Sequence, residues 1–112
     1  MTKFIEVVTT TDSIEEARSL IDKILNLKLA ACGSIVPIES SYWWEDKVEK
    51  TAEFQLTMKT IESNYVEIEN LILQNHSYET PQIISIPILG GSREYLDWLV
   101  KVTDQKSEQD LY

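Results

Sequence analysis

The sequence has no long apolar run, only one cysteine and no export signal. A membrane-spanning helix needs about 18 or more consecutive apolar residues, and no such run occurs in the 112 residues. With Cys32 as its single cysteine, the chain cannot form an intrachain disulfide. The first residues also lack the apolar core and cleavage site of a signal peptide. We therefore expect a cytoplasmic protein with no membrane partner.

Basic residues are scarce as well. The chain has 10 Lys and Arg against 19 Asp and Glu, which gives a formal net charge of −9. Contacts to phosphate groups require clustered basic side chains, and none of the Lys and Arg residues are clustered. The charge balance therefore predicts that the protein has no nucleic-acid partner.

Common catalytic motifs are absent too. The sequence contains no G-x-S-x-G elbow, no Walker loop and no H-E-x-x-H zinc motif. Its one histidine and one cysteine lie in unrelated segments, and nothing indicates a third group that would orient them. We predict that the protein is not an enzyme and that it requires no cofactor.

The length fits a single domain over residues 1–112. β-Branched and aromatic residues predict strands at residues 4–10, from 29 past Pro37, at 48–60 and at 83–89. Pro37 cannot donate to a β-ladder, so it indicates an edge strand or a bulge. Residues 104–112 are mostly polar, and we expect this tail to fray.

Three helices are predicted between and after these strands. Ser13 and Glu16 form a capping-box pattern that opens the first helix, which ends near residues 26–28. The second helix is predicted at residues 61–75, and Ser92 can cap the third. Each has an apolar stripe at helical spacing, formed by Ile14, Ala17, Ile21, Ile24 and Leu25, by Ile61, Tyr65, Ile68, Leu71 and Ile72, and by Tyr95, Trp98, Leu99 and Val102.

The predicted element order is β-α-β-β-α-β-α. Two β-α-β units that flank a hairpin make the α+β arrangement called split βαβ, or ferredoxin-like, here with an added C-terminal helix. Right-handed crossovers place both long helices on one face of the antiparallel sheet. The other face is left without a helical cover, which predicts a partner for it.

The stretch at residues 41–59 predicts a long β-hairpin with its tip near Asp46. Apolar and polar residues alternate through its second half, as expected of a strand with one buried face. A strand over residues 48–60 would run about 43 Å at about 3.3 Å per residue. A globule of this length is only about 34 Å across. Either a bulge breaks the hairpin, or a partner buries its end.

Aromatic residues near the hairpin tip favour the second of these alternatives. Trp43 and Trp44 are neighbours on a strand, so their side chains point to opposite faces, and one core cannot easily take both. Tryptophan is a favoured anchor at protein interfaces, although a ligand-stacking role is an alternative. We predict that Tyr42, Trp43, Trp44 and Trp98 contribute to an interface between copies of the chain.

Cys32 and His76 are the candidate metal ligands. A thiolate suits copper(I) or zinc, and a neutral imidazole can join it. Two ligands cannot complete a tetrahedral site, so any such binding is expected to be weak unless carboxylates or other subunits contribute. The alternatives are that Cys32 is a small buried apolar residue and that His76 caps the C-terminal end of the second helix.

Several motifs, in order, resemble the CutA divalent-ion tolerance family. They are LAAC at 29–32, SYWWEDK at 41–47, residues 53–60, HSYETP at 76–81, and Ile86-Pro87 through Tyr95-Leu96-Asp97-Trp98. The resemblance covers nearly the whole chain. It implies a cytoplasmic homotrimer of ferredoxin-like subunits whose hairpins interlock around a threefold axis. It also implies a role in tolerance of copper and other divalent metals, with possible weak metal binding.

The resemblance also implies a cleft between subunits, bordered by Cys32, Lys59 and Tyr78. Glu53 lies on the same polar strand face as Lys59, and Glu79 follows Tyr78. A lysine beside a carboxylate could hold a small anionic ligand in this cleft, as in signalling trimers of the PII type, an analogy that rests on fold alone. The alternative is an ordinary solvated strand face with ion pairs.

Two departures from the family pattern are visible. Asp46 stands at a turn position where the family usually has Gly, so we expect a wider turn here. The end of the first strand carries Thr9, Thr10 and Thr11, where some members have a metal-binding cysteine. This difference weakens the transfer of a copper site to this chain.

Overall fold

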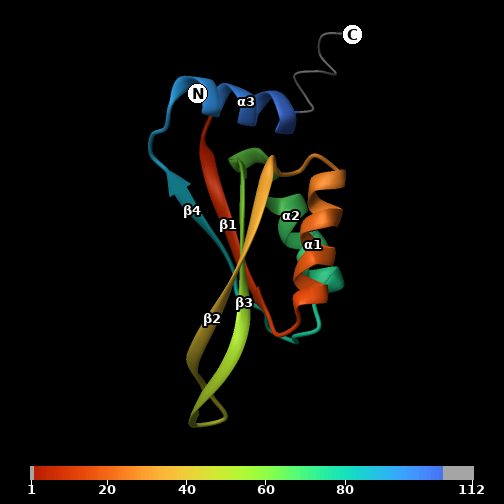
Figure 1. Ribbon diagram of the computed structural model, residues 1–112, viewed down its shortest axis with the longest axis vertical. Coiled ribbons are helices and arrows are strands. Elements are labelled where there is room, and N and C mark those ends of the chain that lie inside the picture. The colour runs from red at the N-terminus through yellow and green to blue at the C-terminus, as the bar shows by residue number, and fades with distance from the viewer. Residues whose placement is uncertain (1, 105–112) are drawn as a thin grey trace.

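The computed structural model describes residues 2–104, which form one four-stranded antiparallel sheet with three helices (Figure 1). The strands are ordered β2-β3-β1-β4, which confirms the predicted ferredoxin-like α+β fold. The predicted fraying tail lies outside the described residues except for Asp104. The elements are β1 (Phe4–Thr11), α1 (Ile14–Asn26), β2 (Cys32–Trp44), β3 (Lys47–Ile61), the 3-10 turn η1 (Glu62–Asn64), α2 (Tyr65–Asn75), β4 (Ile83–Ile88) and α3 (Arg93–Thr103).

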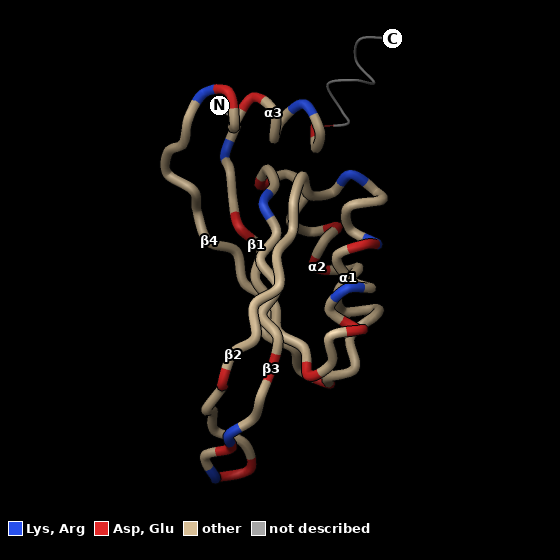
Figure 2. Tube along the Cα trace, in the orientation of Figure 1, with Lys and Arg blue, Asp and Glu red and all other residues tan. Residues whose placement is uncertain are grey.

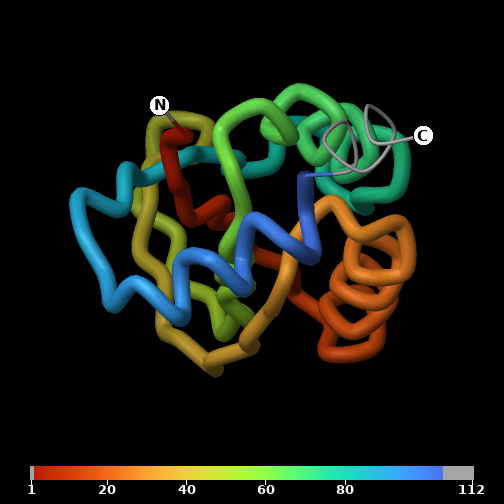
Figure 3. The backbone as a smooth tube through the Cα atoms, turned by 90° about the horizontal axis from the view of Figure 1, so that it is seen from above, coloured from red at the N-terminus to blue at the C-terminus, as the bar shows by residue number. Residues whose placement is uncertain are grey.

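Helices α1 and α2 cover one face of the sheet, as predicted, and α3 lies across one end of it (Figures 1 and 3). The core between helices and sheet is built from alternate strand residues and from one stripe of each covering helix. Its fully buried apolar side chains include Val7, Leu56 and Met58 from the sheet, Leu20 and Ile24 from α1, and Ile68 and Ile72 from α2. No helix in the described part of the chain is long and apolar enough to cross a membrane.

Ser13 caps α1 as predicted, but Glu16 does not complete the capping box. The backbone N–H of Glu16 donates to Oγ of Ser13 at 3.2 Å. The Glu16 carboxylate instead accepts hydrogen bonds from the backbone N–H and the hydroxyl of Ser77, at 2.6 and 2.9 Å. The start of α1 is thereby tied to the loop after α2.

The predicted start of the second helix is wrong by four residues. Ile61 belongs to β3, where it pairs with Phe4, and helix α2 begins only at Tyr65. The intervening turn is held by Asn64, whose amide donates to the carbonyl oxygens of Leu29 and Thr103, at 3.2 and 3.0 Å. The pairing of Ile61 in the sheet and the bonds of Asn64 keep this segment out of the helix, although Ile61 has helical spacing from Tyr65.

The start of one strand and the buried face of one helix also differ from the prediction. Strand β2 starts at Cys32 rather than at residue 29, because Lys28 has a left-handed backbone (φ 57°) and Leu29 turns into the core. On α3, Leu99 is buried as predicted, but Tyr95 and Trp98 are partly exposed. The helix crosses the end of the sheet, so a single chain covers only part of its apolar stripe.

The β2–β3 hairpin is continuous from base to tip. Its strands pair in one register from Cys32 opposite Lys59 to Trp44 opposite Lys47, which excludes the bulge that the sequence left open. The hairpin extends well beyond the rest of the fold (Figure 1). The molecule measures 53 × 27 × 21 Å, and its radius of gyration of 15.3 Å exceeds the roughly 13 Å of a compact chain of this length.

The hairpin turn is tight, so the prediction of a wider turn is wrong. Only Glu45 and Asp46 separate the paired residues Trp44 and Lys47, and both have positive φ angles, 49° and 64°. Two-residue turns of this kind match the twist of the strands, and Asp is among the residues that tolerate the left-handed region. Pro37 lies in β2, an edge strand, as predicted.

The sheet face opposite α1 and α2 carries exposed apolar side chains. It is formed by the residues that alternate with the core positions, such as Thr57, which pairs with Val8, and Gln55, which pairs with Val36. Val36 on β2 and Ile84 and Ile86 on β4 are all exposed on this face. The face is thus apolar at both edges of the sheet.

Candidate functional site

The candidate site is an open groove of ≈ 800 Å³ along the outer half of the hairpin, from its middle to its tip. Its walls come from the end of β1, from both hairpin strands and from the loop between α2 and β4. Acidic residues occur on both hairpin strands, and charges of both signs gather at the tip (Figure 2). The lining residues are Thr10, Glu39, Ser40, Ser41, Tyr42, Trp43, Trp44, Glu53, Tyr78, Glu79, Thr80 and Gln82.

Glu53 is the buried carboxylate of this groove. The strand alternation had placed it on a polar face, yet only 5% of its surface is exposed. The hydroxyl of Tyr78 donates to Oε2 of Glu53 at 2.7 Å. Burial, and then this bond to the Glu53 carboxylate, raise the pKa of Tyr78 far above its usual range. Tyr78 therefore remains a neutral donor that holds Glu53 in place.

His76 orients the loop that carries Tyr78. Its Nε2 lies 2.7 Å from the carbonyl oxygen of Thr10, and its Nδ1 accepts the backbone N–H of Tyr78 at 3.0 Å. These two partners assign the neutral tautomer with the proton on Nε2. The side chain is fully buried. His76 is the C-cap residue of α2, as its position in the sequence indicated, but its ring bonds to β1 and to its own loop rather than to the helix carbonyls.

A second group of predicted residues lies around Cys32, at the other end of the sheet. Sγ of Cys32 is 3.4 Å from the hydroxyl of Tyr95, whose ring contacts that of Trp98 with 5.6 Å between centroids. The hydrogen bond with Cys32, together with burial, raises the pKa of Tyr95 to about 12. Lys59 is opposite Cys32 in the hairpin and opposite Glu6 on β1.

The five predicted cleft residues therefore form two groups within one chain. Glu53, Tyr78 and Glu79 line the groove, whereas Cys32 and Lys59 form the distant pair. Six residues of β3 separate Lys59 from Glu53, about 20 Å at 3.3 Å per residue. A cleft that contains all five residues requires more than one copy of the chain.

The predicted metal ligands do not meet within one chain. His76 bonds to Thr10, which is opposite Gln55, and Cys32 is opposite Lys59. The four-residue step along β3 corresponds to about 13 Å. Both ring nitrogens of His76 are already hydrogen-bonded, and the described residues contain no group of three or more His, Cys, Asp or Glu that could hold a metal ion. Thr9, Thr10 and Thr11, at the position of the family's cysteine, are buried at the end of β1.

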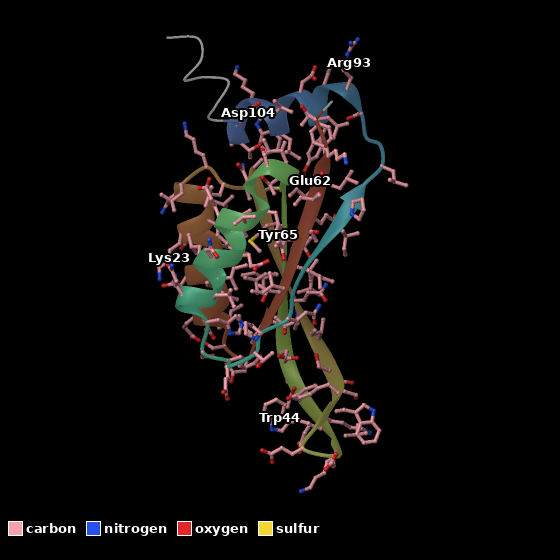
Figure 4. All side chains as sticks on the ribbon, turned by 180° about the vertical axis from the view of Figure 1, so that it is seen from behind. Lys23, Trp44, Glu62, Tyr65, Arg93 and Asp104 are labelled. Carbon is pink, nitrogen blue, oxygen red and sulfur yellow. The ribbon has the colours of Figure 1, made fainter. Side chains whose placement is uncertain are left out.

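The predicted interface residues are exposed at both ends of the molecule. Tyr42, Trp43 and Trp44 lie on the outer hairpin, where 74% of Trp43 and 51% of Trp44 is exposed. Trp43 and Trp44 are consecutive paired residues of β2, so they lie on opposite faces of the ribbon. The Trp44 side chain is visible near the hairpin end in Figure 4. Trp98, 43% exposed, lies on α3 at the opposite end.

Sequence reasoning missed Glu39, Thr10, Gln82 and the bond between Glu16 and Ser77. Glu39 lies on β2, six residues before the hairpin turn, and nothing in the local pattern separates it from an ordinary exposed strand residue. Thr10 and Gln82 join the groove only because β1 ends beside the loop after α2. Only the bond of Glu16 had a signal in the sequence, its capping-box position, and that position indicated Ser13 as the partner rather than Ser77.

Comparisons with known proteins identify the family. The sequence profile of the family described as "CutA1 divalent ion tolerance protein" matches residues 5–102. The divalent-cation tolerance protein CutA of Archaeoglobus fulgidus is 42% identical over 93 residues, which are 83% of this chain and 91% of that protein. The chloroplastic CutA 1 protein of Oryza sativa is 44% identical over 100 residues, 88% of this chain but only 56% of the rice protein.

A solved structure agrees with the sequence comparisons. It is that of the periplasmic divalent cation tolerance protein CutA from A. fulgidus, with a TM-score of 0.86 and 41% identity over 92% of this chain and 99% of that one. Identity at this level over nearly whole chains shows a common family as well as a common fold. The chain therefore belongs to the CutA1 divalent ion tolerance protein family, a family of non-enzymatic tolerance proteins.

Proposed function

We propose that the protein acts in divalent-cation tolerance as a homotrimer assembled through the outer hairpin and the uncovered sheet face. The observation that carries the proposal is the unbroken hairpin, whose tip leaves at least half of Trp43, Trp44 and Val48 uncovered by the described residues. Large exposed apolar side chains on a protruding ribbon support burial by a neighbouring chain. The threefold number comes from the family resemblance.

The uncovered sheet face supports the same assembly. Val36, Ile84 and Ile86 are exposed along its two edge strands. At about 25 cal/mol per Å² of apolar surface removed from water, covering such a face contributes several kcal/mol to association. Edge strands also offer unpaired backbone groups to a neighbour. The hairpin and the face would be buried together in one assembly.

Sedimentation equilibrium tests the assembly. The protein should sediment at about three times its chain mass of 12.9 kDa. Trp43→Ala should move dissociation to a higher protein concentration, because it removes an interface anchor. Leu73→Ala is the matched control, since Leu73 is an exposed apolar residue on α2, outside the proposed interface. A wild-type mass of one chain at every concentration would refute the proposal.

We propose further that any direct contact with copper or another divalent cation is weak. Cys32 carries the one thiol of the chain, and the residue is partly exposed. Calorimetric titration with copper or zinc should show binding that Cys32→Ser weakens. His76→Gln should leave the metal affinity unchanged, because both ring nitrogens of His76 are already hydrogen-bonded, to Thr10 and to Tyr78. Absence of binding at millimolar metal would remove direct binding from the proposal.

The cytoplasmic location is proposed from the single cysteine and from the family resemblance. The names of the relatives differ on this point, since the A. fulgidus structure is described as periplasmic and the rice protein as chloroplastic. Cell fractionation with an antibody against the native chain tests the location directly. Recovery with a soluble cytoplasmic marker is the expected result, and recovery in another compartment would contradict it.

A further inference from the structure

His76, the chain's only histidine, has a buried ring that two backbone groups hold in its neutral form. Its Nε2–H donates to the carbonyl oxygen of Thr10 at 2.7 Å, and its Nδ1 accepts the backbone N–H of Tyr78 at 3.0 Å. No ring nitrogen is left free for a metal ion. Histidine is also the side chain that ordinarily changes its charge between about pH 5 and pH 8. A second proton, on Nδ1, would turn this acceptor into a donor.

A carboxylate lies close enough to become the new partner of Nδ1. Oε1 of Glu16 on α1 is 3.9 Å from Nδ1 of His76, which is too long for a hydrogen bond. The Glu16 carboxylate already accepts the backbone N–H and the hydroxyl of Ser77. Each carboxylate oxygen has about two acceptor positions, so Oε1 can accept an N–H from the ring as well. Nδ1 therefore has one partner for each protonation state.

The surroundings of the ring can accommodate a positive charge. His76 is the C-cap residue of α2, and the C-terminal end of a helix stabilises a cation. Carboxylates also outnumber basic groups on the elements around the ring. The titratable side chains there are Glu16 and Lys23 on α1, Asp12 after β1, Glu53 on β3, and Tyr78 and Glu79 in the loop after α2.

Protonation of the ring would act directly on Tyr78. It would place two N–H groups against each other across the 3.0 Å contact between Nδ1 and the Tyr78 backbone. A shift of the ring toward Glu16 by about 1 Å would make a normal hydrogen bond there and leave the Tyr78 N–H without its acceptor. The hydroxyl of Tyr78 donates to Oε2 of Glu53 at 2.7 Å. A displaced Tyr78 backbone therefore weakens the bond that ties the loop to the hairpin.

We propose that His76 is a pH-sensitive switch that controls the contact between the loop after α2 and the hairpin. At neutral pH, Nδ1 accepts the N–H of Tyr78 and the contact is held. In acid, a proton from solvent adds to Nδ1, which then donates to Glu16 and releases Tyr78. The switch lies within one chain, so it does not rest on the proposed trimer. It goes beyond divalent-cation tolerance because it responds to a proton rather than to a metal.

Nuclear magnetic resonance of the intact, ¹⁵N-labelled protein tests the switch between about pH 8 and about pH 5, the range in which histidine ordinarily titrates. A chelator in the buffer removes metal ions, and the single histidine gives one set of ring signals. The ring should change from its Nε2–H form to the doubly protonated form. The amide and ring signals of Tyr78 should shift with the same midpoint. Protection of the Tyr78 amide against hydrogen exchange should fall by about twofold to tenfold, as for the loss of one hydrogen bond.

Two outcomes of this titration would overturn the proposal. In the first, the ring stays neutral throughout the pH range while the protein remains folded. In the second, the ring becomes doubly protonated but the signals and the amide protection of Tyr78 do not change. Either outcome would show that the two side chains are not coupled through Nδ1.

Variants separate the imidazole from the surrounding carboxylates. His76→Gln removes the titrating group and should abolish the response of Tyr78, which would persist if a carboxylate were its source. Glu16→Gln removes the charge that receives the protonated ring, so more acid should be needed to protonate His76 than in the wild type.

Glu67→Gln is the matched control for Glu16→Gln. Glu67 is an exposed residue in the first turn of α2, at the opposite end of that helix from His76. The change in net charge is the same, and His76 should titrate as in the wild type, because a distant surface charge is screened. Equal effects of Glu16→Gln and Glu67→Gln would overturn the role of Glu16 as the second partner. This comparison decides the question even if His76→Gln does not fold.

Discussion

The hydroxyl of Tyr78 donates a 2.7 Å hydrogen bond to Oε2 of Glu53, 25 residues earlier in the chain. This bond joins the loop after α2 to the middle of the hairpin, where Glu53 pairs with Ile38, and it explains how a carboxylate can be buried on the uncovered face of the sheet. The same loop is held by His76 against Thr10 and by Ser77 against Glu16. The groove wall is thus a rigid structure, fixed at three successive residues.

Tyr78→Phe removes the hydroxyl and leaves the Glu53 carboxylate without this donor. We expect the free energy of unfolding to fall by about 1–3 kcal/mol, the usual cost of losing a hydrogen bond to a buried charged group. Urea denaturation measures the change. In a double-mutant cycle, Glu53→Gln should cost less in the Tyr78→Phe background than in the wild type. Additive losses would show that the two side chains do not stabilise the fold as a pair.

Gly33→Ala should destabilise the protein through a clash in the core. A Cβ atom at Gly33 would lie 3.0 Å from Cγ2 of the buried Ile21, and overpacking of this kind costs about 1–3 kcal/mol. Gly90→Ala is the matched control, because no atom lies within 4 Å of its added Cβ and its φ is not positive. Denaturation curves should separate the two variants. Equal effects would contradict the close approach of Ile21.

Asp46→Gly should stabilise the hairpin turn. Asp46 has φ 64°, a left-handed conformation that Gly adopts without the strain of a side chain. We expect a gain of about 0.5–1 kcal/mol in thermal or urea unfolding. Asp46→Ala is the control, since it removes the same charge but retains a Cβ, and it should destabilise the protein. If both variants stabilise it, the charge and not the backbone geometry is responsible.

High pH should weaken the folded state through its tyrosines. Burial raises the pKa of Tyr65 to about 12, and the hydrogen bond with Cys32 raises that of Tyr95 to about 12. Between pH 10 and 12 the native tyrosines keep protons that the unfolded chain has lost. The unfolded state then binds fewer protons, so the free energy of unfolding falls as the pH rises through this range.

Spectrophotometric titration of tyrosinate in the native protein checks this expectation. Tyr65→Phe and Tyr95→Phe should each remove a late-titrating component and flatten the loss of stability above pH 10. A single titration step near pH 10 in the native protein, with an unchanged slope in both variants, would contradict it.

Local patterns were enough to predict most elements, because their spacing reflects one buried face. The alternation through Leu56 and Met58 identified β3, and the spacing of Ala17, Ile21 and Ile24 identified α1. Ser13 marked the start of α1 correctly, because a cap acts over only three residues. Helical spacing gave a wrong prediction at Ile61, because this residue pairs with Phe4 in the sheet.

The candidate site was predictable only in part. Tyr78, Glu53 and Glu79 were selected and do lie together, but they came from the family resemblance and strand polarity rather than from any predicted contact. His76 was selected as a ligand or a cap, and its actual partners are a carbonyl 66 residues away and a neighbouring backbone N–H. Long-range hydrogen bonds of this kind leave no periodic signal in the chain.

By itself, the sequence determined the order of strands and helices, the long hairpin and the opposed directions of Trp43 and Trp44, since each depends on spacing between near neighbours. Only the tertiary structure decided that Glu53 is buried, that Cys32 and His76 lie apart, and that the hairpin runs unbroken to a two-residue turn. The burial of Glu53 and the partners of His76 depend on how the loop after α2 packs against the end of β1. The contacts in that packing join residues that are far apart in the chain, so no local sequence pattern reveals them.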